Sequence, residues 1–213
     1  MDANMETVID IKMKRCAEAL EKNNFKAYIA QTGAEALEIF GALINKGDTI
    51  GLGGSATLGE LGVVEMCRSP EYRLFDRYAP GLTPAEMNEV MRQSLLSDVF
   101  ITSTNAVTEN GELYNIDGRA NRVAAMLFGP TSVIVIAGYN KIVKDLEAAD
   151  KRVREIAAPM NCVRLGKDTP CTKTGSCADC RSEGRICADK VVMARQMVKD
   201  RVKVILVKEE LGY

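Results

Sequence analysis

Apolar segments of strand length alternate with amphipathic segments of helix length along almost the whole chain. Two of the apolar segments, 99–102 and 132–137, contain no alternating polar residues, which is typical of strands buried on both faces of a parallel sheet. The predicted strands are 25–30, 48–52, 99–102, 132–137 and 202–207, and the predicted helices are 4–22, 32–44, 83–97 and 142–157. Strands that alternate with helices over short connections predict an α/β fold with a mostly parallel sheet flanked by helices.

Local signals support the predicted helices. Thr32 with Glu35, and Thr83 with Glu86, have the spacing of a capping box, and Pro84 occupies the favoured first helical position. Inward-facing positions repeat at helical spacing. They are Ile9, Met13, Cys16 and Leu20 in the first helix, Met87, Met91 and Leu95 in the third, and Leu146, Ala149, Val153 and Ile156 in the last.

Composition narrows the possible chemistry. The chain has 213 residues and no histidine, which excludes Ser–His–Asp and Cys–His catalysis and histidine-ligated zinc. The net charge of −1 favours neither a nucleic acid nor a membrane surface as a partner. The length predicts a single domain over 1–213, in which the polar, cysteine-rich segment 166–187 forms an insertion or lid.

The N-terminus has acidic residues at positions 2 and 6 and no apolar stretch typical of a signal peptide. We therefore expect a cytoplasmic protein, in which clustered cysteines bind metal or take part in redox chemistry more often than they form disulfides.

A glycine-rich segment follows the predicted strand 48–52 and precedes a predicted helix. Glycines at such a position let backbone N–H groups approach an anionic ligand. The expected ligand-binding residues here are Gly53, Gly54, Ser55 and Thr57. The alternative is that Thr57 and Glu60 only cap a helix behind a tight turn.

A polar loop follows the buried strand 99–102. It includes four expected ligand-binding residues, Thr104, Asn105, Asp117 and Asn121. Within it, Glu109 is the expected nucleophile or general base, with Arg122 and Lys141 as cationic partners, because the carboxyl ends of parallel strands meet at one edge of the sheet. The alternatives are turn formation at Asn-Gly and Asp-Gly and a structural ion pair at Glu109.

Four cysteines lie within one polar segment. Cys171, Cys177, Cys180 and Cys187 are predicted to bind one metal centre, either zinc or an iron–sulfur cluster. Two alternatives remain open: a redox pair at Cys177 and Cys180, or unliganded surface thiols. The isolated residues Cys16, Cys67 and Cys162 are predicted to be small core residues.

Several motifs together resemble the LUD domain of lactate-utilisation proteins. They are Gly51-Leu-Gly-Gly-Ser55, Asp76-Arg77-Tyr78-x-Pro-Gly81, the 102–109 loop, Asn121-Arg122-Val-Ala, Gly129-Pro130 and Gly138-Tyr-Asn-Lys141. The resemblance implies a fold similar to that of glucosamine-6-phosphate deaminase, ribose-5-phosphate isomerase and CoA transferases (NagB/RpiA/CoA-transferase-like). It also implies that the glycine segment binds an anionic group, and Glu109-Asn110-Gly111 is similar to the motif of a nucleophilic glutamate in one class of CoA transferases.

The resemblance leaves two function classes open. The first is a component of L-lactate or hydroxyacid oxidation and electron transfer, working with redox partner subunits. The second is a stand-alone enzyme of the isomerase/CoA-transferase fold that acts through Glu109 on a phosphorylated or CoA-linked ligand. A ligand-binding regulator without turnover is a third reading. Either class implies a small anionic ligand carrying a phosphate, carboxylate or CoA group, and a homo-oligomer is compatible with both.

Overall fold

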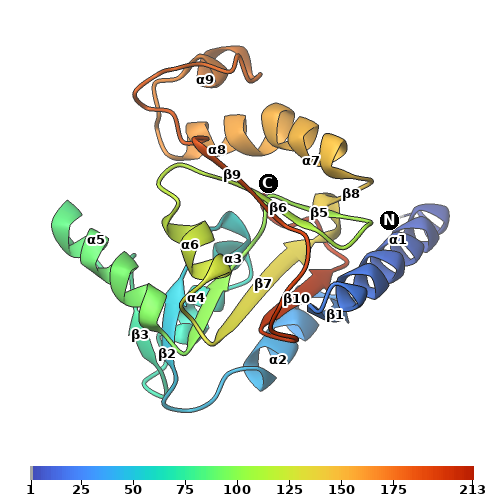
Figure 1. The fold of residues 1–213 in the computed structure, drawn as a ribbon, viewed down its shortest axis with the longest axis horizontal. Helices are drawn as coiled ribbons and strands as arrows, with labels where there is room; N and C mark the ends of the chain where they lie inside the picture. Colours follow the sequence, from blue (N-terminus) through green and yellow to red (C-terminus); the bar gives the residue numbers. More distant parts are fainter. Residues whose placement is uncertain (1) are drawn as a thin grey trace.

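A computed structural model describes residues 2–213 of the chain. Its centre is a six-stranded sheet in the order β1-β10-β7-β4-β2-β3 (Figure 1). All neighbouring strands in it are parallel. The strands are β1 (Lys26–Ala30), β2 (Thr49–Leu52), β3 (Arg73–Phe75), β4 (Val99–Thr102), β7 (Ser132–Gly138) and β10 (Val202–Val207). The predicted α/β class with a mostly parallel sheet is confirmed.

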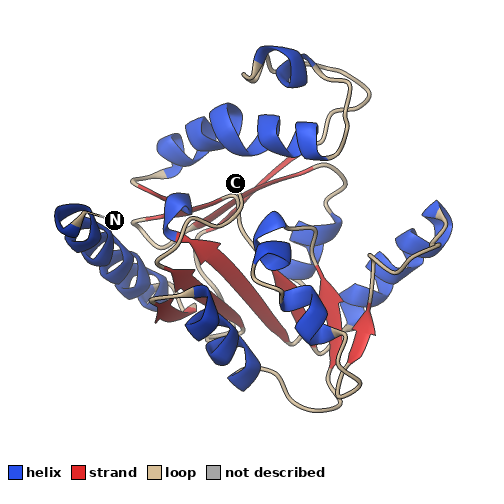
Figure 2. Cartoon of the chain, turned by 180° about the vertical axis from the view of Figure 1, so that it is seen from behind, coloured by secondary structure: helices blue, strands red, loops and turns tan. Residues whose placement is uncertain are grey.

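Helices cover both faces of this sheet (Figure 2). On one face lie α1 (Ala3–Lys22) and α6 (Asn121–Leu127), and on the other α2 (Gly33–Ala42), α3 (Ala56–Glu60) and α4 (Val63–Cys67). In the central strand β7, Val133 and Val135 pack into the first core, whereas Ile134 and Ile136 pack into the second. Because both faces are buried, β4 and β7 need apolar side chains at nearly every position.

A second, smaller sheet lies between the main sheet and a layer of helices near the top of Figure 1. Its order is β8-β5-β6-β9, with β5 (Ala106–Thr108) and β6 (Leu113–Asp117) forming an antiparallel hairpin. The outer strands are β8 (Ile142–Val143) and β9 (Asp189–Met193). The polar loop predicted after strand 99–102 is thus a hairpin that leads into α6.

The last predicted helix differs from expectation. It consists of α7 (Leu146–Arg152), a π-helical turn (Val153–Ala157) and α8 (Ala158–Arg164). The wider π turn changes the helical phase, so Ala157 is buried and Ile156, predicted to face inward, is exposed. The segment 166–188 lies beyond this helical layer and contains only the short helix α9 (Pro170–Thr174) (Figure 1).

The third predicted helix ends earlier than expected, as α5 (Pro84–Gln93) followed by a 3-10 turn (Ser94–Leu96). Its capping box is present in full, and Met91 is its buried inward residue. The inward face predicted for α1 is buried at all four positions, and Cys16, Cys67 and Cys162 are buried as predicted. The sequence patterns did not indicate β3, α4, β8, α8, α9 or β9. Among residues 2–213, no helix has both the length and the apolar composition needed to cross a lipid bilayer.

Candidate functional site

A cavity of about 310 Å³ opens at the carboxyl edge of the main sheet. We call it the edge pocket. Its walls come from the loops that follow β2, β3, β4 and β6, from the turn after β7, and from the end of α8. The side chains and glycines that matter here are Gly54, Ser55, Arg77, Ser103, Thr104, Asn105, Asp117, Arg119, Asn121, Arg122, Lys141, Asn161, Arg164, Lys167 and Tyr213. This is the edge at which parallel α/β sheets bind ligands.

The glycine segment forms one wall because it contacts other loops closely. A Cβ atom at Gly53 would lie 2.8 Å from Cβ of Thr102, so only glycine fits between β4 and the Arg122 side chain. A Cβ atom at Gly54 would lie 3.5 Å from the Arg77 guanidinium, at ordinary contact distance. Ser55 caps α3 by accepting a hydrogen bond from the Leu58 N–H group.

Lys141 lies at the base of the edge pocket and is 2% exposed. Its Nζ atom donates to Thr57 Oγ1 at 2.8 Å and to Ser103 Oγ at 2.9 Å. Burial, together with the nearby positive charges of Arg152 and Arg122, lowers the pKa of Lys141 from 10.5 to about 7. A large fraction of this amine is therefore neutral near pH 7.

The two hydroxyl groups that contact Lys141 accept hydrogen bonds from its amine and leave its lone pair free. Thr57 Oγ1 donates its own hydrogen to the Leu211 carbonyl, and Ser103 Oγ donates to the Thr104 carbonyl, so both must accept from Nζ. A neutral amine has two N–H donors and one lone pair. With both donors used, the lone pair is free to accept a proton from a ligand in the pocket.

Arg122 is already fully hydrogen-bonded within the protein. Its Nε lies 3.2 Å from Oδ2 of Asp117, and its two terminal nitrogens donate to other acceptors of the same loops. These acceptors are the Ser103 and Ile116 carbonyls and the side chains of Asn115 and Asn105. Arg122 therefore organises the wall of the pocket and adds positive charge, while its N–H groups have no spare capacity for a ligand.

Cations outnumber acids around the edge pocket. In the described part of the chain, Asp117 is the only acidic residue lining it, whereas Arg77, Arg119, Arg164 and Lys167 join Arg122 and Lys141. Within residues 2–213, the Arg77 guanidinium and the Lys167 ammonium make no side-chain hydrogen bond or ion pair, although Arg77 lies over the Tyr78 ring at 5.6 Å. A concave site with this charge balance attracts a small anion.

Glu109 lies away from the edge pocket. It follows β5 at the tip of the hairpin, where its Oε2 atom is 2.6 Å from Nη1 of Arg15 on α1. It therefore does not meet Lys141, and the expected pairing of these two residues is not present in the structure. The alternative recognised from the sequence, a structural ion pair, describes this geometry.

The Glu109→Gln variant is expected to keep both its stability and its ligand affinity. Glu109 is 16% exposed but its partner Arg15 is 60% exposed, and an ion pair with a solvated partner contributes ~0–1 kcal/mol. We predict a change of less than ~1 kcal/mol in the free energy of unfolding, measured with urea, and no change in the affinity for sulfate. A tenfold loss of sulfate affinity would show instead that Glu109 reaches the ligand.

The expected ligand-binding residues fall into two groups. Gly54, Ser55, Thr104, Asn105, Asp117 and Asn121 line the edge pocket, whereas Gly53 and Thr57 lie directly behind its wall. The edge pocket is also lined by residues that were not expected to bind the ligand: Arg77, Ser103, Arg119, Asn161, Arg164, Lys167 and Tyr213. Arg77 lies in one of the motifs shared with the LUD domain and Ser103 in another, so their motif membership was the available signal.

The four cysteines predicted to bind a metal lie around a second, smaller pocket, together with Cys162. Among residues 2–213, no three His, Cys, Asp or Glu side chains are arranged as they stand to coordinate one metal ion. All seven cysteines are free thiols.

The fold and the edge pocket define an α/β domain with a cationic pocket at the carboxyl edge of its parallel sheet. The LUD domain profile matches residues 13–207, and the chain belongs to the LUD domain family of lactate-utilisation-type proteins.

Two solved structures were compared with this chain. A DUF162 family protein from Deinococcus radiodurans is 16% identical, with a TM-score of 0.52 over 95% of this chain and 98% of that one, which shows a shared fold. eIF2B delta from Chaetomium thermophilum is 19% identical, with a TM-score of 0.35 over 54% of this chain and 49% of that one. No curated protein sequence gives a significant match.

Proposed function

We propose that this lactate-utilisation-type protein binds a small carboxylate in the edge pocket and that Lys141 exchanges a proton with it. The observation that carries the proposal is a nearly fully buried amine, with a pKa of about 7, at the base of a cationic cavity. A volume of about 310 Å³ is at the small end of ligand sites, which suits a metabolite rather than a polymer.

A 2-hydroxy acid such as L-lactate fits this chemistry. Its carboxylate would pair with Arg77 and Lys167, two cations of the pocket that form no ion pair with an acidic side chain of the described residues. Its hydroxyl group would face the lone pair of Lys141, which would accept the hydroxyl proton as the alcohol is oxidised to a ketone. The two electrons and the carbon-bound hydrogen would leave to an acceptor held by a redox partner subunit, so the chain would act as one component of a hydroxyacid-oxidising system.

The alternative is a stand-alone enzyme acting on a phosphorylated or CoA-linked ligand. The cationic lining suits a phosphate as well as a carboxylate. Covalent CoA transfer requires a carboxylate nucleophile, however, and the one carboxylate among the described residues that lines the pocket, Asp117, is paired with Arg122 at 3.2 Å. The geometry therefore favours the hydroxyacid.

Calorimetric titration with L-lactate, pyruvate, ribose 5-phosphate and CoA distinguishes these candidates. We expect L-lactate and pyruvate to bind at least tenfold more tightly than the other two. Tighter binding of ribose 5-phosphate or CoA would replace the hydroxyacid proposal with the alternative, and binding of none of the four would contradict both.

The Arg77→Ala variant is expected to lose ligand affinity but not stability. A charge-assisted hydrogen bond to a carboxylate contributes ~1.5–3 kcal/mol, so pyruvate affinity should fall ~10-fold or more. The matched control is Arg92→Ala, which removes an exposed arginine of α5 that forms a weak ion pair with Glu89 at 3.8 Å. Equal pyruvate affinity in the two variants would exclude Arg77 from the binding site.

A further inference from the structure

Five cysteines from two parts of the chain meet at one pocket, which we call the cysteine pocket. Cys162 comes from α8 and is buried, whereas Cys171, Cys177, Cys180 and Cys187 come from the segment 166–188 and are partly exposed. Ala158 and Thr169 complete the wall on the side of the helical layer. The contribution of Cys162 was not anticipated from the sequence, because it is isolated from the other four cysteines along the chain and was predicted to be an ordinary core residue.

The segment 166–188 has no apolar core of its own. Ile186 is its only large aliphatic or aromatic residue, and α9 is its only regular element. Loops of this length without secondary structure are uncommon unless they have a function. Small elements that cannot bury enough apolar surface are usually stabilised by disulfides or by a metal, and all the thiols here are free.

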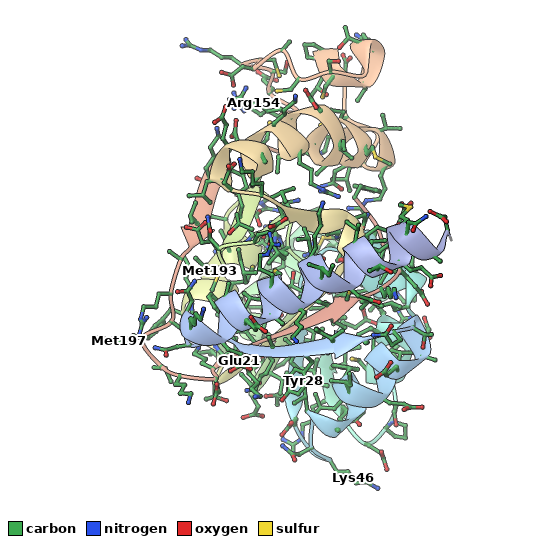
Figure 3. All side chains as sticks on the ribbon, turned by 90° about the vertical axis from the view of Figure 1, so that its right-hand side faces the viewer. Glu21, Tyr28, Lys46, Arg154, Met193 and Met197 are labelled. Carbon is green, nitrogen blue, oxygen red and sulfur yellow. The ribbon has the colours of Figure 1, made fainter. Side chains whose placement is uncertain are left out.

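Polar contacts shape the segment around the thiols. The Arg185 side chain donates to the Cys180 carbonyl at 2.5 Å and to the Cys187 carbonyl at 3.0 Å, and also pairs with Asp179. Arg185 itself lines the cysteine pocket. Arg154, in the π turn beneath the segment (Figure 3), adds a second positive charge near Cys177 and Asp179. Both arginines also pair with carboxylates, Arg154 with Asp150 at 2.7 Å and Arg185 with Asp179 at 3.2 Å, so they offset only part of the negative charge that thiolates would bring.

The cysteine pocket and the edge pocket share a wall. Ile186 lines the edge pocket while the adjacent Cys187 lines the cysteine pocket. In the same way, Cys162 of α8 lines the cysteine pocket, whereas Asn161 and Arg164 of the same helix line the edge pocket. On the opposite side, a Cβ atom at Gly118 would lie 3.1 Å from the Ile186 backbone, so the segment packs tightly against the loop after β6.

We propose that the cysteine pocket binds one metal centre through its thiolates, and that this centre holds Ile186 and α8 in place as a wall of the edge pocket. In the structure the five sulfur atoms do not converge on one point. Each cysteine side chain has a single χ1 angle, and rotation about it among three rotamers would turn the sulfur atom toward a shared metal. An all-thiolate site suits zinc or an iron–sulfur cluster. The second half of this proposal rests on the proposed function of the edge pocket.

Metal analysis of the full-length chain, purified without oxygen and without chelators, tests the first half. We expect either one zinc per chain or iron with acid-labile sulfide, and this distinction identifies the centre. A chain stripped under reducing conditions should bind one equivalent of Co²⁺ with sulfur-to-cobalt charge-transfer absorption. A chain with no metal as purified and no such absorption would overturn the proposal.

Replacing both Cys177 and Cys180 by serine leaves three of the five thiols, too few for a closed site of four thiolates. We expect Co²⁺ affinity to fall at least 100-fold in this double variant. The matched control is Cys67→Ala, at the end of α4 in the second core, which should bind Co²⁺ like the parent chain. Equal Co²⁺ affinity in the double variant and the parent would contradict the assignment.

Sulfate titration of the zinc-loaded and the stripped parent chain tests the second half. We expect at least tenfold weaker sulfate binding without metal, at unchanged far-ultraviolet circular dichroism, because the segment 166–188 contributes no strand to the main sheet. Equal affinity would remove the link between the pockets. If metal binds but sulfate does not bind in either state, the proposed function fails while the metal centre stands.

Discussion

Replacing Lys141 by methionine is expected to stabilise the protein at pH 6 by ~2–3 kcal/mol. The shift of its pKa from 10.5 to about 7 corresponds to ~5 kcal/mol, from which two lost hydrogen bonds of ~1 kcal/mol each are subtracted. Below pH 7 the lysine is charged in both the folded and the unfolded chain, so the full cost of burying it is present. Between pH 7 and pH 10.5 only the unfolded chain is protonated, and the cost decreases as the pH rises.

Urea denaturation at pH 6, 8 and 10 measures this effect. The advantage of Lys141→Met over the parent should be largest at pH 6, should vanish at pH ~9 and should become a deficit of ~1 kcal/mol at pH 10, where the two lost hydrogen bonds outweigh the remaining burial cost. Lys14→Met, at an exposed position on α1, is the control and should show no such trend. A Lys141→Met variant that is less stable than the parent at pH 6 would show that the amine is favourably placed as a cation.

The same variant separates ligand binding from stability. In the parent, sulfate should bind more tightly as the pH falls from 8 to 6, because sulfate keeps its charge over this range while Lys141 gains a proton. In Lys141→Met this pH dependence should be lost. If sulfate affinity depends on pH equally in both proteins, the proton is taken up by a group other than Lys141.

Gly53→Ala is expected to destabilise the fold by ~1–3 kcal/mol, the usual cost of forcing an extra carbon into a packed region. The new Cβ atom would meet Cβ of Thr102, which is fully buried in β4, and Cγ of Arg122. Neither group can move without disturbing the sheet or the five hydrogen-bonded N–H groups of Arg122. The midpoint of urea unfolding measures this loss.

Gly54→Ala is the matched comparison. Its Cβ atom would stand at 3.5 Å from Arg77 and needs no rearrangement, so stability should stay within ~0.5 kcal/mol of the parent. Because the methyl group would enter the edge pocket beside Arg77, sulfate affinity should nevertheless fall severalfold. Equal stability losses in the two variants would contradict the close packing of Gly53.

Features that depend on neighbours along the chain were predictable from the sequence, whereas features that depend on contacts between distant residues were not. Periodicity and capping are local, and they identified α1, α5 and the buried strands β4 and β7 from the sequence alone. Because parallel strands place their carboxyl ends on one edge of the sheet, the sequence also predicted that the glycine segment, the 104–122 loop and Lys141 lie at one site. The family resemblance extended this to a fold type.

Other features depended on contacts between residues far apart in the chain. Whether Glu109 would face Lys141 or Arg15 depended on how the β5–β6 hairpin packs against α1, which no local pattern encodes. The π turn shifts the helical phase, and the structure accordingly exposes Ile156 and places Cys162 in the wall of the cysteine pocket.

The sequence by itself determined the alternation of strands and helices, the absence of histidine chemistry and the edge of the sheet that carries the site. Only the tertiary structure decided that Lys141 is buried among arginines, and that Arg77, Arg164 and Lys167 complete the cationic lining. The physical reason is that a pKa and a pocket's charge are sums over all neighbours in space. Secondary structure, by contrast, depends mainly on neighbours along the chain.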